Sequence, residues 1–348
     1  MFGIYRTTLA LFVVAQHIYG VPGVGGYAVH AFFCLSGFLM TLLVCETYKG
    51  RPLDFASNRF LRLYPAYWAT ATATALLILL TPIPEMIGQG GTWGWGLPIK
   101  LSDILRNIAF VNANTHIELV PVSWAVTNEL AFYVLIGLGI TNTPLRAFIC
   151  LPISILSTVP YWNSDAFGAP GTFYFLPVSA APSFAVGAAL YHLQRTPKFQ
   201  SFMASPTFPI VAIVLALGSG YFRKVFGQTG MLPLYVNMLA TAPLIVLLYR
   251  LNSKTLAPLD TAIGRFSYPI YLSHELAVLI LAPHPPFWIN APWFRSAIVA
   301  TTLIIAALIV YGIDAPIERL RRKIRDKRTL QSSASRPVHA DAFIGDRR

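Results

Sequence analysis

Charged residues are scarce in this chain. Only 11% of its 348 residues are Asp, Glu, Lys or Arg, whereas ordinary soluble domains carry about 25%. Hydrophobic residues make up 55%. So little charge cannot solvate the surface of a soluble protein of this length. The composition therefore excludes an ordinary soluble enzyme and indicates a membrane protein.

Acidic residues and cysteines are especially few. Fourteen acidic residues stand against 26 basic ones, which gives a net charge of +12. The basic residues lie in short connectors and near the C-terminal end, as orientation in a bilayer requires, so no nucleic-acid partner is expected. The three cysteines Cys34, Cys45 and Cys150 show no metal-ligand spacing, and no metal site is predicted.

Ten apolar segments are long enough, or nearly long enough, to cross a membrane. A cleaved signal peptide over residues 1–20 is disfavoured by its short apolar core and the lack of a small-x-small cleavage site. We therefore predict an all-α polytopic protein of about ten transmembrane helices, with no soluble catalytic domain. Its membrane domain covers 1–318, and residues 319–348 form a basic, disordered tail. The expected segments are 7–22, 28–45, 63–82, 123–140, 146–162, 173–193, 207–222, 231–249, 266–283 and 295–313.

The distribution of Lys and Arg predicts the orientation of these helices. With both termini in the cytoplasm, most basic residues fall on the cytoplasmic side, including the run from Arg319 to Arg328. The opposite side keeps few, among them Lys100 and Arg106. The asymmetry satisfies the positive-inside rule and agrees with an even number of crossings.

The longest connector, 83–122, is rich in Trp and Gly over Gly90–Gly96. Anchoring at the membrane interface explains these tryptophans slightly better than stacking on a sugar does. Further along, Ser102 is expected to cap a short amphipathic helix. Its apolar side would hold Ile104, Leu105, Ile108 and Ala109.

Arg6 and His17 mark the two ends of the first apolar segment. Eleven helical steps place both side chains on one face, about 16 Å apart. A histidine inside a span is costly unless it meets a partner or a polar cavity. It is either a packed histidine bonded to a neighbouring helix or a general base with an arginine at the mouth of its tunnel, and the motifs below favour the base.

Arg59 and Arg62 begin the third segment with the i,i+3 spacing that puts two side chains on one helix face. Two guanidinium groups so placed make a fork for phosphate oxygens. Ordinary anchoring by positive charge is an equally good explanation of this pair alone.

Two further segments carry polar groups into apolar surroundings. Ser36-Gly37 lies inside the second segment, where small residues let another helix approach closely, so packing is its expected role. Glu129 lies one to two turns into its segment. Buried there, it needs an arginine, a histidine or a polar cavity; at a wet helix end it would need none. The rarity of such carboxylates favours the paired alternative.

Five short motifs follow one another along the chain, each weak alone but specific together. In this order they resemble the acyltransferase-3 family of integral-membrane acyltransferases, over roughly residues 4–318. The sequence departs from the family pattern at Ala125, where the family has Ser, and at Asp314-Ala315-Pro316, where it has Glu-x-Pro. The motifs are Arg6-(x)10-His17, Phe32-Phe33-x-Leu35-Ser36-Gly37-Phe38, Arg59-x-x-Arg62, Trp124-(x)4-Glu129-x-x-Phe132-Tyr133 and Ser267-Tyr268-x-x-Tyr271-Leu272-x-His274.

The resemblance implies a role for each polar residue of these motifs. His17 is the central catalytic group, with Arg6 and Glu129 beside it in the reaction. Arg59 and Arg62 would bind the donor acyl-CoA. The substrate-binding set would consist of Ser36, Tyr133 and His274.

The resemblance also implies an activity. Members of the family transfer acyl groups, often acetyl, from acyl-CoA to carbohydrates or other acceptors such as O-antigen, exopolysaccharide or Nod factor. We thus expect an O-acyltransferase of a bacterial inner membrane. The alternative is a glycolipid transporter or flippase that uses His17, Glu129 and His274 as proton relays; the lack of an inverted repeat counts against it.

Overall fold

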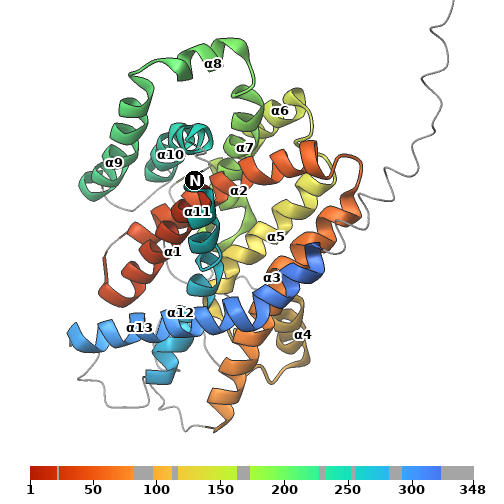
Figure 1. The fold of residues 1–348 in the computed structure, drawn as a ribbon, viewed down its shortest axis with the longest axis vertical. Coiled ribbons are helices and arrows are strands. Elements are labelled where there is room, and N and C mark those ends of the chain that lie inside the picture. Colours follow the sequence, from red (N-terminus) through yellow and green to blue (C-terminus); the bar gives the residue numbers. More distant parts are fainter. Residues whose placement is uncertain are drawn as a thin grey trace, which may run out of the picture.

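A computed structural model of the chain describes residues 1–21, 23–80, 97–111, 117–162, 173–226, 232–251, 255–281 and 292–322. The Trp–Gly segment 90–96 and most of the expected tail lie outside these ranges. All elements within them are helical (Figure 1). The α-helices are α1 (Phe2–Tyr19), α2 (Val24–Leu42), α3 (Pro52–Leu80), α4 (Leu101–Ala109), α5 (Trp124–Gly137), α6 (Pro144–Thr158), α7 (Pro177–Leu193), α8 (Pro197–Ala204), α9 (Phe208–Phe226), α10 (Leu232–Arg250), α11 (Ala257–Gly264), α12 (Ser267–Leu281) and α13 (Pro292–Ile309).

Each of the ten expected apolar segments contains a helix, which confirms the all-α membrane fold. Among the described residues, five helical stretches are long and apolar enough to cross a membrane: Val24–Thr47, Pro52–Leu80, Pro144–Tyr161, Leu232–Arg250 and Pro292–Arg322. A sixth appears if α8 and the start of α9, bent by 85° at their junction, count as one. Helices α5, α7 and α12 have only 14, 17 and 15 residues. The number of ten crossings therefore stays a prediction.

Helix α2 is the central helix of the bundle, because it is apolar around most of its circumference and buried along most of its length. Its longest contact is with α7. A Cβ atom on Gly37 would lie 2.2 Å from the carbonyl oxygen of Phe184, and one on Gly187 would lie 2.0 Å from that of Cys34. Only glycine permits this approach, so the packing role expected for the Ser36-Gly37 pair is confirmed at Gly37.

The start of α1 is fixed by α11, which lies beside it near the N-terminus (Figure 1). The carboxylate of Asp260 accepts hydrogen bonds from the backbone N–H groups of Gly3 and Ile4, at 3.0 and 2.9 Å. A carboxylate at a helix N-terminus satisfies donors that have no partner within the helix and complements the helix dipole. The contact holds α1 in register against α11 and so fixes the position of Arg6, one turn further on.

Two π-helical turns extend α2 and α13, over Leu43–Thr47 and Val310–Asp314. Each changes the direction in which the following side chains point, and such turns are often found at functional sites. Both adjoin the pocket described below.

Helix α4 differs from the helix expected at Ser102. It begins at Leu101 after the N-cap Lys100, whose side chain makes no cap, so the expected serine cap is wrong. Its polar side is the buried one, with Asp103 and Asn107 inside, while its apolar side is exposed. Asn107 explains this orientation, because its amide bonds the backbone of the following loop at Ile117 and Leu119.

Candidate active site

Arg6 and His17 lie at opposite ends of one face of α1. The side chains between them at helical spacing, Ala10 and Val13, are buried. Together with Leu9 they line an internal cavity. The face predicted from sequence thus runs from an arginine, along an apolar wall, to a histidine.

His17 meets His274 at the far end of this face. Nδ1 of His17 lies 2.8 Å from Nε2 of His274, which is on α12. The other nitrogen of His274, Nδ1, lies 2.7 Å from the carbonyl oxygen of Tyr271. The sequence placed His274 in the substrate-binding set; the structure places its ring in direct contact with His17. We call these two residues the histidine pair.

Glu275, which the sequence analysis did not select, is the third polar group at the histidine pair. Its carboxylate and the ring nitrogens of both histidines lie within 4.8 Å of one another. Its Oε2 accepts a hydrogen bond from the backbone N–H of Val122, at 3.2 Å. The signal that could have found it is the one that found Glu129, an acidic residue within an apolar segment.

These three residues form a donor set that zinc can use. The observed spacing suits hydrogen bonding better. The two histidine nitrogens are 2.8 Å apart, whereas nitrogen ligands on a tetrahedral zinc, each about 2.1 Å from the metal, lie roughly 3.4 Å apart. A metal would have to separate the histidine pair.

Glu129 lies nearer the Arg6 end of this face. Two other residues selected from sequence, Ser36 and Tyr133, meet it there. The hydroxyl of Ser36 donates to Oε1 of Glu129 at 2.5 Å, and the hydroxyl of Tyr133 donates to the same oxygen. Glu129 is only 6% exposed. Glu129 is therefore buried and not at a wet helix end, and two hydroxyl groups bind it where an arginine, a histidine or a polar cavity was expected. The guanidinium of Arg59 lies over the ring of Tyr133, 5.9 Å from its centre.

Arg6, Arg59 and Arg62 share one pocket of about 450 Å³. Three more arginines line it: Arg265 from the C-terminal end of α11, and Arg321 and Arg322 from the end of the helical stretch Pro292–Arg322. We call this the arginine pocket. Anchoring by positive charge alone does not require arginines from separate helices to converge, so the phosphate-binding interpretation of Arg59 and Arg62 gains support.

The arginine pocket is organised by a few acceptors. The side-chain oxygen of Asn58 accepts from Arg59 at 2.6 Å and from Arg321 at 2.8 Å. Glu318 also binds Arg321, at 2.6 Å, and Asp314 faces Arg62 at 4.0 Å. Asn58, Arg321 and Asp314 were not selected as site residues from sequence. Asn58 directly precedes Arg59 in the sequence, whereas Asp314 and Arg321 approach the pair only through tertiary folding.

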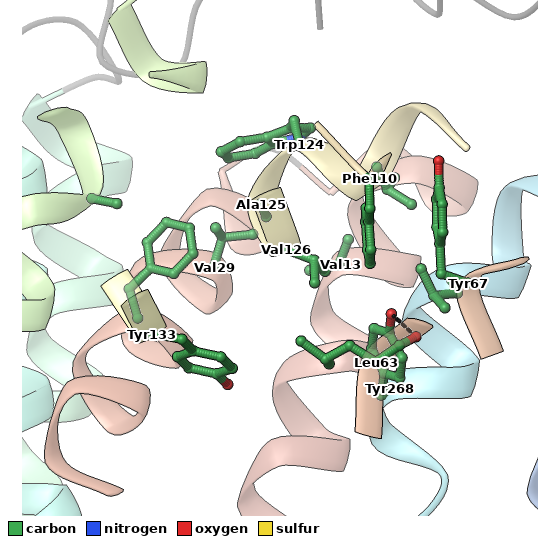
Figure 2. Packing of buried hydrophobic residues seen from close by; sticks show 14 of the residues in the cluster. Val13, Val29, Leu63, Tyr67, Phe110, Trp124, Ala125, Val126, Tyr133 and Tyr268 are labelled. Carbon is green, nitrogen blue, oxygen red and sulfur yellow. Dashed lines mark hydrogen bonds between the residues drawn. The ribbon is translucent and has the colours of Figure 1, made fainter. Parts of the chain in front are cut away.

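An apolar cavity of about 50 Å³ lies against the middle of this face of α1, beside Leu9, Ala10 and Val13. Figure 2 shows Val13, Val29 and Val126 in a row at this place, with Tyr133 and Tyr268 nearby. Glu129 lines it, and so does Tyr271, whose backbone carbonyl holds His274. Its walls come from α1, α2, α5 and α12, the helices that carry His17, Ser36, Glu129 and His274.

Comparison with known proteins gives one match. The family model of the acyltransferase-3 domain matches residues 2–311, a range that contains every site residue selected from sequence. Neither the curated proteins nor the solved structures include a match. With the match extending over most of its length, the chain belongs to the acyltransferase-3 family of membrane acyltransferases.

Proposed function

We propose that this acyltransferase moves a short acyl group, most simply acetyl, from acyl-CoA to a hydroxyl group of a carbohydrate or glycolipid. The observation that carries the proposal is the order of three features along one face of α1. Arg6 lines the arginine pocket, Ala10 and Val13 line a narrow apolar cavity, and His17 belongs to the histidine pair. A donor with phosphates at one end and a thioester at the other matches these chemistries in the same order.

The arginine pocket suits the nucleotide end of the donor. Guanidinium groups bind phosphate oxygens through two parallel hydrogen bonds, and here Arg59 and Arg321 are already held together by Asn58. The pantetheine arm of CoA is comparable in length to the distance of about 16 Å from Arg6 to His17. The thioester would therefore reach the histidine pair while the phosphates stay among the arginines.

His17 acts as the general base in this scheme. It takes the proton of the acceptor hydroxyl as the hydroxyl oxygen attacks the thioester carbonyl. A carbon–oxygen bond forms, the carbon–sulfur bond breaks, and the proton passes to the departing thiolate. Transfer through an acyl-histidine is the alternative; direct transfer needs no covalent intermediate, and we favour it.

Thiol release tests the reaction directly. Detergent-purified protein mixed with acetyl-CoA and a glycan acceptor should release free CoA, whereas His17→Gln should not. The alternative function, a glycolipid transporter with an intramembrane proton relay, predicts no thiol release at all. Mass spectrometry of surface glycans with and without the protein should show the mass of one acyl substituent, and an unchanged glycan profile would count against the proposed acceptor class.

We also propose that both termini face the cytoplasm of a bacterial inner membrane. The proposal rests on the Lys and Arg asymmetry, and it places the arginine pocket where acyl-CoA is made. Reporter fusions after Gln331 should be active in the cytoplasm and fusions near Gln89 on the other side. The reverse pattern would separate the arginine pocket from its donor and contradict the scheme.

A further inference from the structure

The histidine pair belongs to a chain of hydrogen bonds that ends on a backbone carbonyl. Nδ1 of His274 faces the carbonyl oxygen of Tyr271 at 2.7 Å, and its Nε2 faces Nδ1 of His17 at 2.8 Å. A carbonyl oxygen can only accept, so a neutral His274 carries its proton on Nδ1. Its Nε2 then has a lone pair and can only accept as well.

This chain determines where His17 holds its own proton. Facing an acceptor, Nδ1 of His17 must donate, and a neutral imidazole with its proton on Nδ1 has its lone pair on Nε2. We propose that His274 is a positioning residue that holds His17 in this tautomer and so makes Nε2 of His17 the base. The inference rests on the proposed acyl transfer for the role of the base, but the tautomer itself can be measured without any substrate.

The acceptor atom of His274 is held rigidly. His274 is fully buried, and α12 is tied to its neighbours on both sides. The hydroxyl of Tyr268 donates to the backbone of α3 at Leu63, at 3.0 Å, and the hydroxyl of Tyr271 donates to the carbonyl of Val122, at 2.6 Å. A fixed acceptor selects one tautomer before the substrate arrives, which is the preorganisation that precise proton transfer requires.

The same arrangement accommodates the positive charge that forms on His17. Once Nε2 has taken the hydroxyl proton, Nδ1–H still donates to His274, and the carboxylate of Glu275 lies within 4.8 Å. Glu275 is held in place by the backbone N–H of Val122. His274 keeps its own proton throughout, because the proton on His17 returns to the thiolate. It orients the base and does not relay protons.

Two substitutions at His274 distinguish a positioning role from a substrate-binding role and from a purely structural one. A glutamine can place its amide oxygen where Nε2 now lies and accept from His17. An asparagine, one methylene shorter, reaches only the carbonyl of Tyr271. His274→Gln should keep kcat within about tenfold of the native value. His274→Asn should lower kcat by about 10²-fold or more, since general-base catalysis contributes about 10²–10⁴-fold.

KM and thermal stability complete this comparison. In both variants KM for acetyl-CoA should stay unchanged and melting temperatures should match, so that a kcat difference reports on the base. Equal losses in the two variants, or equal activity, would overturn the positioning role. A raised KM for the acceptor with normal kcat would assign His274 to substrate binding instead.

Nitrogen-15 NMR of histidine-labelled protein measures the tautomer without donor or acceptor. The chain has seven histidines, and the resonances that disappear in His17→Gln identify His17. We expect a protonated Nδ1 and an unprotonated Nε2 in the native protein, and a mixture of tautomers in His274→Asn. A proton on Nε2 of native His17 would refute the inference. The expected tautomer together with no thiol release would leave the hydrogen-bond chain standing and refute the proposed reaction.

Discussion

The two ends of the α1 face solve different chemical problems. At one end six arginines line a single pocket of about 450 Å³. At the other, one histidine contacts one histidine, with one carboxylate nearby. Among the described residues, the first site holds several like charges, whereas the second holds two histidines and one carboxylate. In the proposed function, this difference matches what each end would recognise: the phosphates of the donor at one end and a single hydroxyl group at the other.

Phosphate binding can be shared among many donors, because several weak and partly exposed contacts add to one affinity. The arginines show this gradation: the side chain of Arg321 is 15% exposed and that of Arg322 is 64% exposed. Proton transfer cannot be shared in this way, since one nitrogen must face one hydroxyl. Substitutions should therefore cost most at the histidine end and least among the arginines.

The largest effect is expected from His17→Gln. Glutamine still hydrogen-bonds across the helix interface, but it cannot accept a proton near neutral pH. The rate of thiol release should fall about 10²–10⁴-fold, with the Kd for CoA little changed because the arginine pocket is untouched. Stopped assays of thiol release and equilibrium binding of CoA measure the two quantities separately.

His17→Gln also separates catalysis from packing. If His17 only packs, the glutamine protein should retain most of its activity. If the well-folded variant acylated at a near-native rate, His17 would not be the general base, and His274 would be the next candidate. The contrast between the two ends of α1 would then no longer hold.

An intermediate effect is expected in the apolar cavity beside the middle of the α1 face. Val13 lines the cavity, whose volume is only about 50 Å³, and Val13→Ala removes part of its wall. Longer acyl groups should then be accepted, and the ratio of kcat/KM for butyryl-CoA to that for acetyl-CoA should rise roughly tenfold. Val246→Ala, a buried substitution in a separate hydrophobic cluster, is the matched control and should leave the ratio unchanged. Equal ratios in the two variants would place the acyl group elsewhere.

The sequence predicted much of this architecture because the membrane leaves few choices. Apolar segments in lipid must be helical, and each of the ten expected segments contains a helix. Polar residues inside such segments were conspicuous for the same reason. Ser36, Glu129 and Tyr133 were all selected, and the structure brings them together.

What the sequence could not predict depends on how helices approach one another. Glu275 acquires its position from the backbone of Val122, 153 residues away. Asn58 and Arg321 meet across 263 residues. No spacing rule connects such pairs. At α4 the amphipathic pattern did not show which side is buried; Asn107 lies inside, where it bonds the following loop, and the apolar side is exposed.

A smaller effect is expected among the arginines. Arg59→Lys and Arg321→Lys keep the charge but lose the planar pair of donors. Each should raise the Kd for CoA about tenfold, which corresponds to about 1.4 kcal/mol, while kcat at saturating donor stays near native. Arg146→Lys is the matched control, because that guanidinium donates to Gly139 and Asn142 in the turn that joins α5 to α6 and does not line the arginine pocket as described. If Arg146→Lys weakened CoA binding as much as the other two substitutions, the loss would be a general consequence of replacing arginine by lysine and would not identify a phosphate contact in the pocket.

The smallest effect, and the most specific, is expected from Asn58→Ala. The oxygen of Asn58 accepts from both Arg59 and Arg321 and holds the two cations close together before any phosphate arrives. Its loss removes a neutral acceptor and leaves both charges, so the Kd for CoA should rise only about threefold, within the 0.5–1.5 kcal/mol of an ordinary hydrogen bond.

The informative quantity in this experiment is the coupling free energy between Arg59 and Arg321. With Asn58 present, the double variant Arg59→Lys/Arg321→Lys should weaken binding by less than the product of the single effects, because either substitution already disrupts the shared arrangement. In the Asn58→Ala background the two effects should multiply. If the two fold-changes in Kd multiplied in both backgrounds, the two arginines would bind phosphate independently of each other. The pocket would then attract phosphate only by its summed positive charge, and Asn58 would not couple the two guanidinium groups.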